Sequence, residues 1–324
     1  MKVGKVSESV LKRSVLKQIK SKNTQIKNGA GVGADCAIFA CGNTFAATCM
    51  QAAVVSVPAD IRYSILKAAG GAACSGAVPK MVQMSLLLPE DAEESLLKQY
   101  MAEADSAAAE LGMAIAGGHT EVTKAVTSPC VTVQVTGTIP DKYIEPGGAK
   151  PGQDIVVSKW IGLEGSARLA EKYADRLSAR YPYHMIAEAA AFKRYLSIIP
   201  EAATAIKSNV SAMHDISGGG IFAALWELAE SAGVGLTVDL KKIPIRQETI
   251  EVCEFFGISP YEMLSGGALL MTSDDGEGLV QALEAIYIPA TVIGKITNNN
   301  DRVIINEDEK RFLERPRADE FTKI

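Results

Sequence analysis

The chain has 324 residues, of which 48% are hydrophobic and 22% charged, and its formal net charge is -5 at pH 7. This length predicts two domains of roughly 150 residues, and the composition is typical of a globular protein. The acidic balance excludes a nucleic-acid binder, because phosphate backbones require clustered Lys and Arg. No apolar run approaches the ~20 residues of a membrane helix. Residues 1–20 also lack the apolar core of a signal peptide, so we expect a cytoplasmic protein.

Helix-like and strand-like segments alternate along the N-terminal half. Apolar spacing predicts helices within 11–20, 60–76 and 92–112. We expect the second helix to end at its glycines, and Gly112 to end the third. Strands are predicted over 35–40, 44–50, 80–88, 113–118 and 130–139, the first two as a hairpin.

Residues 140–153 are rich in Pro and Gly and form the candidate linker between domains over 1–145 and 151–324. Beyond them, strands are predicted over 154–160, 210–216, 235–240, 267–273 and 290–296. Helices are predicted over 165–177, 185–196, 220–233 and 278–286. Mixed helices and strands in both halves indicate an α/β or α+β architecture in each domain.

The six cysteines contain no C-x-x-C pair, and we expect them to be buried, reduced thiols. The three histidines do not supply zinc-ligand spacing, which excludes a zinc site.

Three glycine-rich stretches carry the candidate site residues. In the first, residues 29–39, Gly31 and Gly33 let the backbone approach a ligand. Asp35 offers a carboxylate to phosphate-bound Mg²⁺. The alternative is a tight turn in which Asp35 caps its own backbone.

The second stretch, residues 114–123, is a predicted strand that ends at Gly117 and Gly118. It delivers His119, Thr120 and Glu121 at the strand's C-terminal end, where α/β proteins usually place ligands. His119 fits a donor to phosphate or a general acid–base near neutral pH. The alternative is a turn histidine bonded to a backbone carbonyl.

The third stretch, residues 213–230, is a strand that ends at His214 and Asp215, followed by glycines and an amphipathic helix. The glycines are Gly218, Gly219 and Gly220, preceded by Ser217. Amides at a helix N-terminus form a ready anion site. The alternative is that Asp215 or Ser217 simply caps the helix. Neither a Walker A loop nor a dinucleotide fingerprint is present.

In order and spacing, four segments together resemble the AIR synthase-related superfamily: GVGADCAIF, GAACSGAVPKMVQMSLLLP, AGGHTEV and MHDISGGGIFAALWELA. KWIGLEGSARLA and SGGALLMT are similar to its hydrogenase maturation branch, whose members are hydrogenase expression/formation proteins. The resemblance implies a two-domain AIR synthase-like fold. Its N-terminal domains pair across a dimer into a β-barrel, and its C-terminal domain is α/β.

The resemblance also implies that ATP binds with Mg²⁺ and that its γ-phosphate is transferred to an oxygen of a small-molecule substrate. Carried over to this chain, Asp35 and Glu121 are the metal ligands, while His119 and Asp215 are the catalytic residues. The residues expected to hold the nucleotide are Gly31, Gly33, Gly117, Gly118, Thr120, Ser217, Gly218, Gly219 and Gly220. The implied assembly is a homodimer, or a heterodimer with a homologue.

The chain departs from the family's acidic pattern. Ala34 replaces the first residue of the acidic pair, TCMQ at 48–51 has no carboxylate, and Gly70–Gly71 stand where the family has an Asp. His119 replaces an acidic residue. The branch's carrier cysteine in a C-terminal tail is also missing, since the last cysteine is Cys253.

Two functions therefore stay open. One is an ATP-dependent enzyme that acts on a small molecule. The other is a degenerate paralogue that binds nucleotide without turnover or serves as a structural partner of an active homologue. A nucleotide-free adaptor is a third reading.

Overall fold

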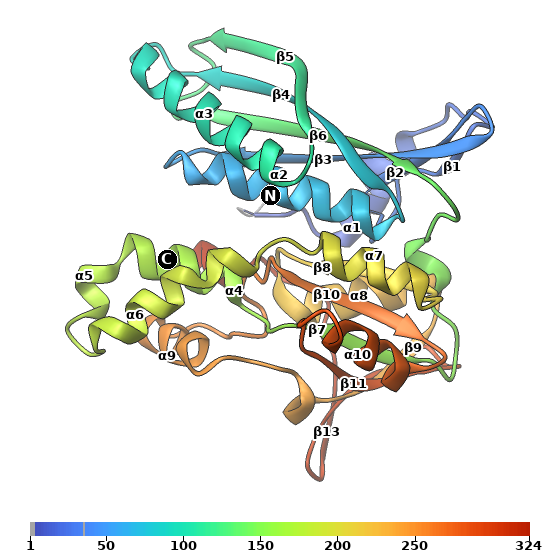
Figure 1. The fold of residues 1–324 in the computed structure, drawn as a ribbon. Coiled ribbons are helices and arrows are strands. Elements are labelled where there is room, and N and C mark those ends of the chain that lie inside the picture. Colours follow the sequence, from blue (N-terminus) through green and yellow to red (C-terminus); the bar gives the residue numbers. More distant parts are fainter. Residues whose placement is uncertain (1–3, 35) are drawn as a thin grey trace. The chain divides into compact units, whose positions relative to one another are not determined.

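The computed structural model describes residues 4–34 and 36–324, and the chain forms two compact units (Figure 1). Unit 1 contains the described residues of 4–21, 31–33 and 144–324. Unit 2 contains those of 22–30 and 34–143. Each unit has a mixed sheet with helices, which confirms the predicted α/β architecture. The described residues include no helix long and apolar enough to cross a membrane.

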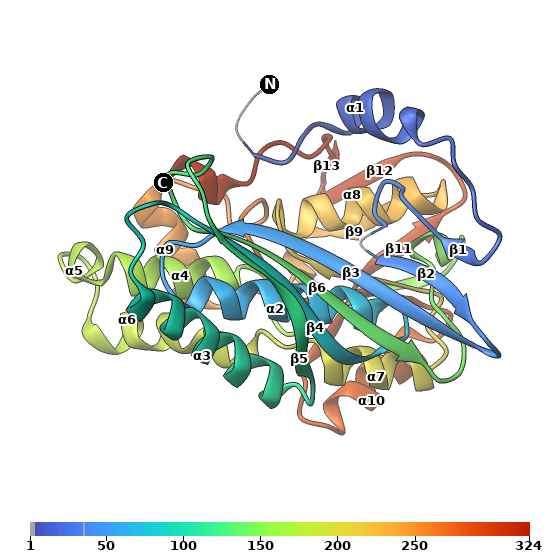
Figure 2. The same cartoon turned by 90° about the horizontal axis from the view of Figure 1, so that it is seen from above.

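Unit 2 is a six-stranded sheet in the order β1-β2-β3-β6-β4-β5. Its strands are β1 (Ile26–Asn28), β2 (Cys36–Cys41), β3 (Thr44–Val54), β4 (Val78–Leu88), β5 (Ala114–Val122) and β6 (Cys130–Ile139). Only β4 and β5 run parallel; the other neighbours are antiparallel. Helices α2 (Ala59–Cys74) and α3 (Glu94–Glu110) cover one face, as Figures 1 and 2 show.

Helix α2 does not end at its glycines as the sequence predicted. It continues through Gly70 and Gly71, which are buried together with Ala69 and Ala72. The helix packs against β3 and β6, and small side chains permit a close approach to the sheet. Tertiary packing therefore outweighs the poor intrinsic helix propensity of glycine.

Strand β5 is likewise longer than predicted. It does not end at Gly117–Gly118 but runs on to Val122, because β4 pairs with it as far as Leu88 opposite Val122. His119, Thr120 and Glu121 therefore lie within an edge strand rather than in a turn after it.

Unit 1 is built on a seven-stranded sheet in the order β13-β12-β9-β11-β7-β10-β8. Its strands are β7 (Asp154–Ser158), β8 (Ala212–Ile216), β9 (Gly235–Asp239), β10 (Ala268–Ser273), β11 (Ala290–Thr297), β12 (Arg302–Asn306) and β13 (Glu309–Phe312). Only β9 and β12 are parallel neighbours. The predicted strands of this half are all present in the described chain.

The α-helices of unit 1 are α1 (Glu8–Val10), α4 (Leu163–Lys172), α5 (Ala174–Leu177), α6 (Tyr183–Ala190), α7 (Ile199–Lys207), α8 (Gly220–Ala232), α9 (Gln247–Phe256) and α10 (Gly276–Glu284). Short 3₁₀ segments lie at Leu16–Gln18, Pro146–Gly148, Ala191–Tyr195, Leu240–Lys242 and Glu320–Lys323. Helix α8 buries Ile221, Leu225 and Leu228 in the core formed with the strands. A second apolar cluster joins α4, α6 and α9. The third glycine-rich stretch thus lies between the buried strand β8 and the helix α8.

The N-terminal segment of unit 1 lies along α8 (Figure 2). It forms a short α-turn and a π-turn, Leu11–Val15, instead of the regular helix predicted over 11–20. Its hold on α8 is polar: Glu8 accepts from Trp226 Nε1 at 2.9 Å, and Lys12 pairs with Glu230 at 2.5 Å. These tertiary contacts determine the conformation of the segment, which departs from the regular helix that its apolar periodicity predicts.

The cysteines are free thiols. Four are buried as predicted, but Cys41 is exposed and Cys130 is half-buried. Cys41 is the last residue of β2, where the hairpin turn leaves its side chain in solvent.

Candidate functional site

The third glycine-rich stretch forms a strand–loop–helix junction. Gly219 is the N-cap of α8 with φ +85°, and Gly220 follows with φ +66°. A Cβ on Gly220 would lie 2.4 Å from the carbonyl oxygen of Tyr261, so only glycine fits there. Neither Asp215 nor Ser217 caps the helix with its side chain, and that alternative is wrong. The loop instead leaves the Gly219 amide available to an acceptor from elsewhere.

That acceptor is Asp319, 100 residues further along the chain. Its Oδ2 accepts a hydrogen bond from the Gly219 N–H at 2.6 Å. Its Oδ1 accepts from the Leu264 N–H at 3.2 Å and from the Phe321 N–H at 2.8 Å. An anion therefore already lies at the helix N-terminus, as the dipole and the free amides favour. Asp319 could not be predicted from the sequence, because no local pattern connects it to the loop.

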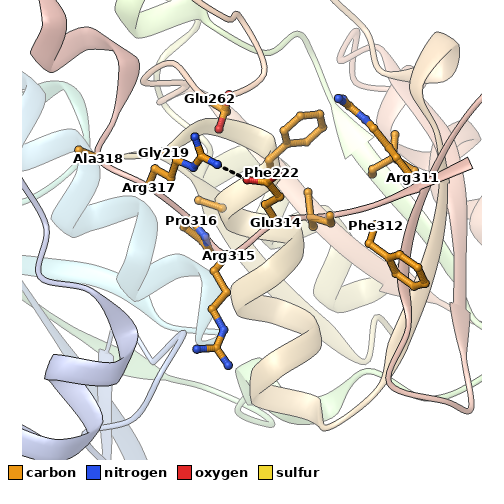
Figure 3. A pocket seen from close by; sticks show the side chains of 13 residues that line it. Gly219, Phe222, Glu262, Arg311, Phe312, Glu314, Arg315, Pro316, Arg317 and Ala318 are labelled. Carbon is orange, nitrogen blue, oxygen red and sulfur yellow. Dashed lines mark hydrogen bonds and ion pairs between the residues drawn. The ribbon is translucent and has the colours of Figure 1, made fainter.

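Beside this loop is a pocket of about 340 Å³ (Figure 3). Gly219 and Phe222 of α8 form one side, and the segment from Arg311 to Ala318 forms another. Three of the lining residues are arginines: Arg311, Arg315 and Arg317. Figure 3 shows Arg317 joined to Glu314, an ion pair of the same segment. Glu262 and Glu314 also line the pocket, so its three arginines exceed its carboxylates by one.

A buried polar network lies beneath α8. Nδ1 of His214 donates to the backbone carbonyl of Asp215 at 2.7 Å, and its Nε2 lies 3.3 Å from Oε2 of Glu227. Lys5 Nζ binds the other oxygen of Glu227 at 2.6 Å. Burial raises the pKa of Glu227, but the hydrogen bond and charge of His214, together with Lys5, outweigh burial and bring it to about 2. Glu227 is therefore a fixed anion at neutral pH.

Asp215, a predicted catalytic residue, is 8% exposed at the end of β8. Its Oδ1 is buried and has no hydrogen-bond partner among the described residues. A buried carboxylate oxygen without a protein donor is costly, so Oδ1 is an acceptor position for a water or for a ligand group.

In the first glycine-rich stretch, Gly33 lies against α8. It adopts φ +71°, and a Cβ there would lie 2.8 Å from the carbonyl oxygen of Glu227. Unit 1 therefore brings Gly33 next to the helix that begins at the third stretch. Asp35, the predicted metal ligand, lies outside the described residues.

In unit 2, the second stretch brings His119 and Glu121 together. They are two residues apart on β5 and so share one face of the strand, with His119 Nε2 3.1 Å from Glu121 Oε2. Both side chains are more than half exposed. The preceding Gly118 is required by packing, because a Cβ there would lie 1.9 Å from the carbonyl oxygen of Met84 on β4.

The described residues contain no group of three or more His, Cys, Asp or Glu side chains placed to hold a metal ion. The His119–Glu121 pair supplies only one carboxylate, whereas Mg²⁺ prefers several oxygen ligands in octahedral geometry. The described part of the chain therefore does not fit a protein-held magnesium centre.

Comparison with known proteins fixes the family. The family model of the AIR synthase related protein matches over its N-terminal domain at residues 33–139 and over its C-terminal domain at 150–306. These matches span most of both units, and the chain belongs to the AIR synthase related protein family.

Individual relatives are more distant. The chain is 25% identical to a putative hydrogenase expression/formation protein of Methanocaldococcus jannaschii, over 99% of this chain and 97% of that protein. It is 28% identical to the carbamoyl dehydratase HypE of Rhodobacter capsulatus over 63% of this chain, but this match covers only 59% of the relative's length. A solved structure of the hydrogenase maturation protein HypE in complex with ATP has a similar fold. Its TM-score is 0.73 at 17% identity, over 97% of this chain and 95% of that one.

Proposed function

We propose that this protein is a hydrogenase-maturation-factor-like member of its family that binds ATP and transfers a phosphoryl group to an oxygen of a small molecule. The observation that carries the proposal is the junction at Gly219, where a backbone amide at the N-terminus of α8 holds a carboxylate at 2.6 Å. A site that holds one anion by amide donation and helix dipole suits a phosphate oxygen for the same reasons. The relatives named for hydrogenase maturation and the ATP-bound neighbour support the choice of ligand.

Within this proposal, Ser217 and Gly218–Gly220 hold phosphate oxygens, and Asp215 supplies a buried carboxylate near the end of the adjoining strand. Gly31, Gly33, Gly117, Gly118 and Thr120 are proposed to line the nucleotide site on the strength of the family resemblance. His119 is proposed to donate to a phosphate oxygen, and Glu121 and Asp35 to contact the cation. Magnesium is proposed to enter only with the triphosphate, since the described residues form no metal centre.

The second candidate function is a catalytically degenerate paralogue. It is favoured by one specific observation, the absence of a metal-holding cluster among the described residues. Loss of several charge-stabilising contacts removes catalysis, because each one typically contributes about 2.7–4 kcal/mol in the transition state. Such a protein binds nucleotide or a homologous partner without turnover.

Isothermal titration with ATP and Mg²⁺, followed by an ADP-release assay, separates the two functions. Binding with slow ADP release supports the enzyme, and binding without release supports the paralogue. Failure to bind ATP overturns both nucleotide readings. Asp35→Asn should abolish the magnesium-dependent part of the affinity, whereas the same substitution at exposed Asp308 should leave it unchanged.

We further propose that two copies pair through the sheet of unit 2 into the family's barrel. In this chain β5 is an edge strand, and the sheet exposes Met50, Val54 and Val122, at 60%, 59% and 58%. Met50 and Val54 lie on the inner strand β3 and Val122 on the edge strand β5, and both exposed apolar side chains and an unpaired edge are typical of an interface. Sedimentation equilibrium should give a dimer that Met50→Arg dissociates. A wild-type monomer would contradict the pairing.

We also propose that the two family domains span residues 1–145 and 151–324 and that the protein is cytoplasmic. Expression of residues 151–324 alone tests the domain limits, since an independent domain should unfold cooperatively.

A further inference from the structure

The anion-holding loop of unit 1 is filled by the chain's own carboxylate. Oδ2 of Asp319 accepts a hydrogen bond from the Gly219 N–H, and its Oδ1 accepts from the N–H groups of Leu264 and Phe321. While Asp319 is in this position, an external phosphate cannot accept a hydrogen bond from the Gly219 N–H, and the negative charge of Asp319 repels it. The proposed ligand and Asp319 therefore compete for one position.

Asp319 is the last residue of a segment that also forms the wall of the neighbouring pocket. That wall runs from Arg311 to Ala318, directly before Asp319, and the pocket of about 340 Å³ shares Gly219 with the loop. A movement of this segment would uncover the amide and widen the pocket in a single step. We call residues Glu314 to Asp319 the strap.

The arginines of this wall are available to an incoming anion. Arg311 lies over the Phe222 ring at 5.5 Å and Arg315 over the Trp226 ring at 5.9 Å, and in the described structure neither makes an ion pair. Arg317 pairs with Glu314 of the strap itself, at a position where both side chains are more than 70% exposed. Such an exposed pair contributes little and exchanges readily for a phosphate.

We propose that the strap is autoinhibitory: Asp319 plugs the amide cradle at Gly219, and a phosphate-bearing ligand binds there, drawn in by the arginines of the pocket wall, by displacing it. The inference rests on the proposed function, because it concerns the same glycine loop, and it adds the regulation of that site. It follows that removing the Asp319 carboxylate strengthens anion binding. If Asp319 were only a tether for the chain, its removal would loosen the pocket wall and weaken binding.

Titration calorimetry with inorganic pyrophosphate, without added metal, tests the proposal on the full chain. Asp319→Ala should lower the dissociation constant about tenfold, since one charged competitor for the amide is gone. Asp319→Asn keeps the size of the side chain and should give a smaller gain. Adding Arg317→Ala to Asp319→Ala should weaken binding again. Asp308→Ala is the matched control, because it removes an exposed carboxylate from the turn between β12 and β13 and should change nothing.

A measurement on the wild type does not depend on the folding of any variant. Pyrophosphate should accelerate chymotryptic cleavage after Phe321 several-fold, because displacement of Asp319 breaks its hydrogen bond with the Phe321 N–H and frees the strap. Cleavage that is unchanged or slowed, or Asp319 variants that bind pyrophosphate no better than wild type, would overturn the strap.

The two proposals fail separately. If ATP binds wild type and the Asp319 variants equally, the strap is wrong and the nucleotide function stands. If the Asp319 variants gain pyrophosphate affinity but neither they nor the wild type bind ATP, the strap proposal stands and the nucleotide function is wrong. If neither ligand binds any of the proteins, both are wrong.

Discussion

Oε2 of Glu227 on α8 lies 3.3 Å from Nε2 of His214 on β8, so a buried ion-pair contact joins the helix to the edge strand of the sheet. Lys5 completes the contact at 2.6 Å from the other oxygen. Because α8 begins at the glycine loop, this contact ties the helix that carries the loop to the sheet. The ionised carboxylate of Glu227 therefore contributes to the stability of the candidate site.

The first prediction concerns the pH dependence of that stability. The pKa of Glu227 is about 2 in the folded protein, below its usual 4.5, so folding favours the ionised form. Its contribution, about 3 kcal/mol, is complete above pH ~4.5 and is lost as the pH falls toward 2. We expect the difference in unfolding free energy between wild type and Glu227→Gln to shrink by about 2 kcal/mol from pH 7 to pH 3. Urea unfolding at both pH values measures it.

Glu309→Gln is the matched control for this prediction, since Glu309 is an exposed carboxylate of β13 in the same unit. Its difference from wild type should be small at both pH values. A Glu227→Gln difference that stays constant between pH 7 and pH 3 would contradict the depressed pKa.

The second prediction concerns a buried ion pair that follows β7, an inner strand of the same sheet. Lys159 Nζ lies 2.5 Å from Oε1 of Glu201 and also donates to the carbonyls of Tyr195 and Ser197 at 2.6 and 2.8 Å. Burial lowers the pKa of Lys159 and raises that of Glu201, and the charge of each partner opposes the shift of the other. Lys159→Met leaves Glu201 buried without its cation and should cost about 3–5 kcal/mol of unfolding free energy.

The double variant Lys159→Met/Glu201→Leu should recover a large part of that loss in the same urea assay, because no isolated charge remains. Lys207→Met, at an exposed position of α7, is the control and should change little. Equal losses in the single and double variants would show that the pair is not what stabilises this region.

Much of the fold follows from local sequence patterns. The apolar runs that became β7, β8, β10 and β11 predict strands directly, and β7, β8 and β10 are buried at nearly every position, whereas β11 is mostly half-buried. The exceptions arise where long-range packing decides. Helix α2 continues through Gly70–Gly71 because it lies on a sheet, and β5 continues past Gly118 because β4 pairs with it.

The site was predictable only in part. Glycines before an amphipathic helix indicate an anion-holding loop, and that loop is present. Its occupant was not predictable, because Asp319 is 100 residues away and only the fold brings it to Gly219. Glu227 gave a weak signal as an acidic residue on the inner side of a helix, but its partner His214 comes from another element. Sequence spacing does not encode such contacts between elements.

The third prediction compares two adjacent glycines of β5. Their backbones are nearly alike, with φ +152° at Gly117 and +156° at Gly118. A Cβ on Gly118 would lie 1.9 Å from the Met84 carbonyl oxygen, whereas on Gly117 the nearest atom is 4.0 Å away on Gln83. Gly118→Ala should therefore destabilise the protein by about 1–3 kcal/mol more than Gly117→Ala, measured by urea unfolding. Equal losses would show that backbone conformation, not contact with β4, requires the glycine.

The fourth prediction concerns the metal affinity of β5. His119 and Glu121 share a strand face and lie 3.1 Å apart, so His119→Asp places two carboxylates side by side. Mg²⁺ prefers carboxylate oxygen to imidazole, and the affinity for Mg²⁺, or for Mn²⁺ as its spectroscopic substitute, should rise about tenfold. Electron paramagnetic resonance of free Mn²⁺ measures this directly. Thr120→Asp adds the same charge on the opposite face of the strand and should have little effect. If both variants gain equally, added charge alone explains the result and the paired geometry of residues 119 and 121 is irrelevant to metal binding.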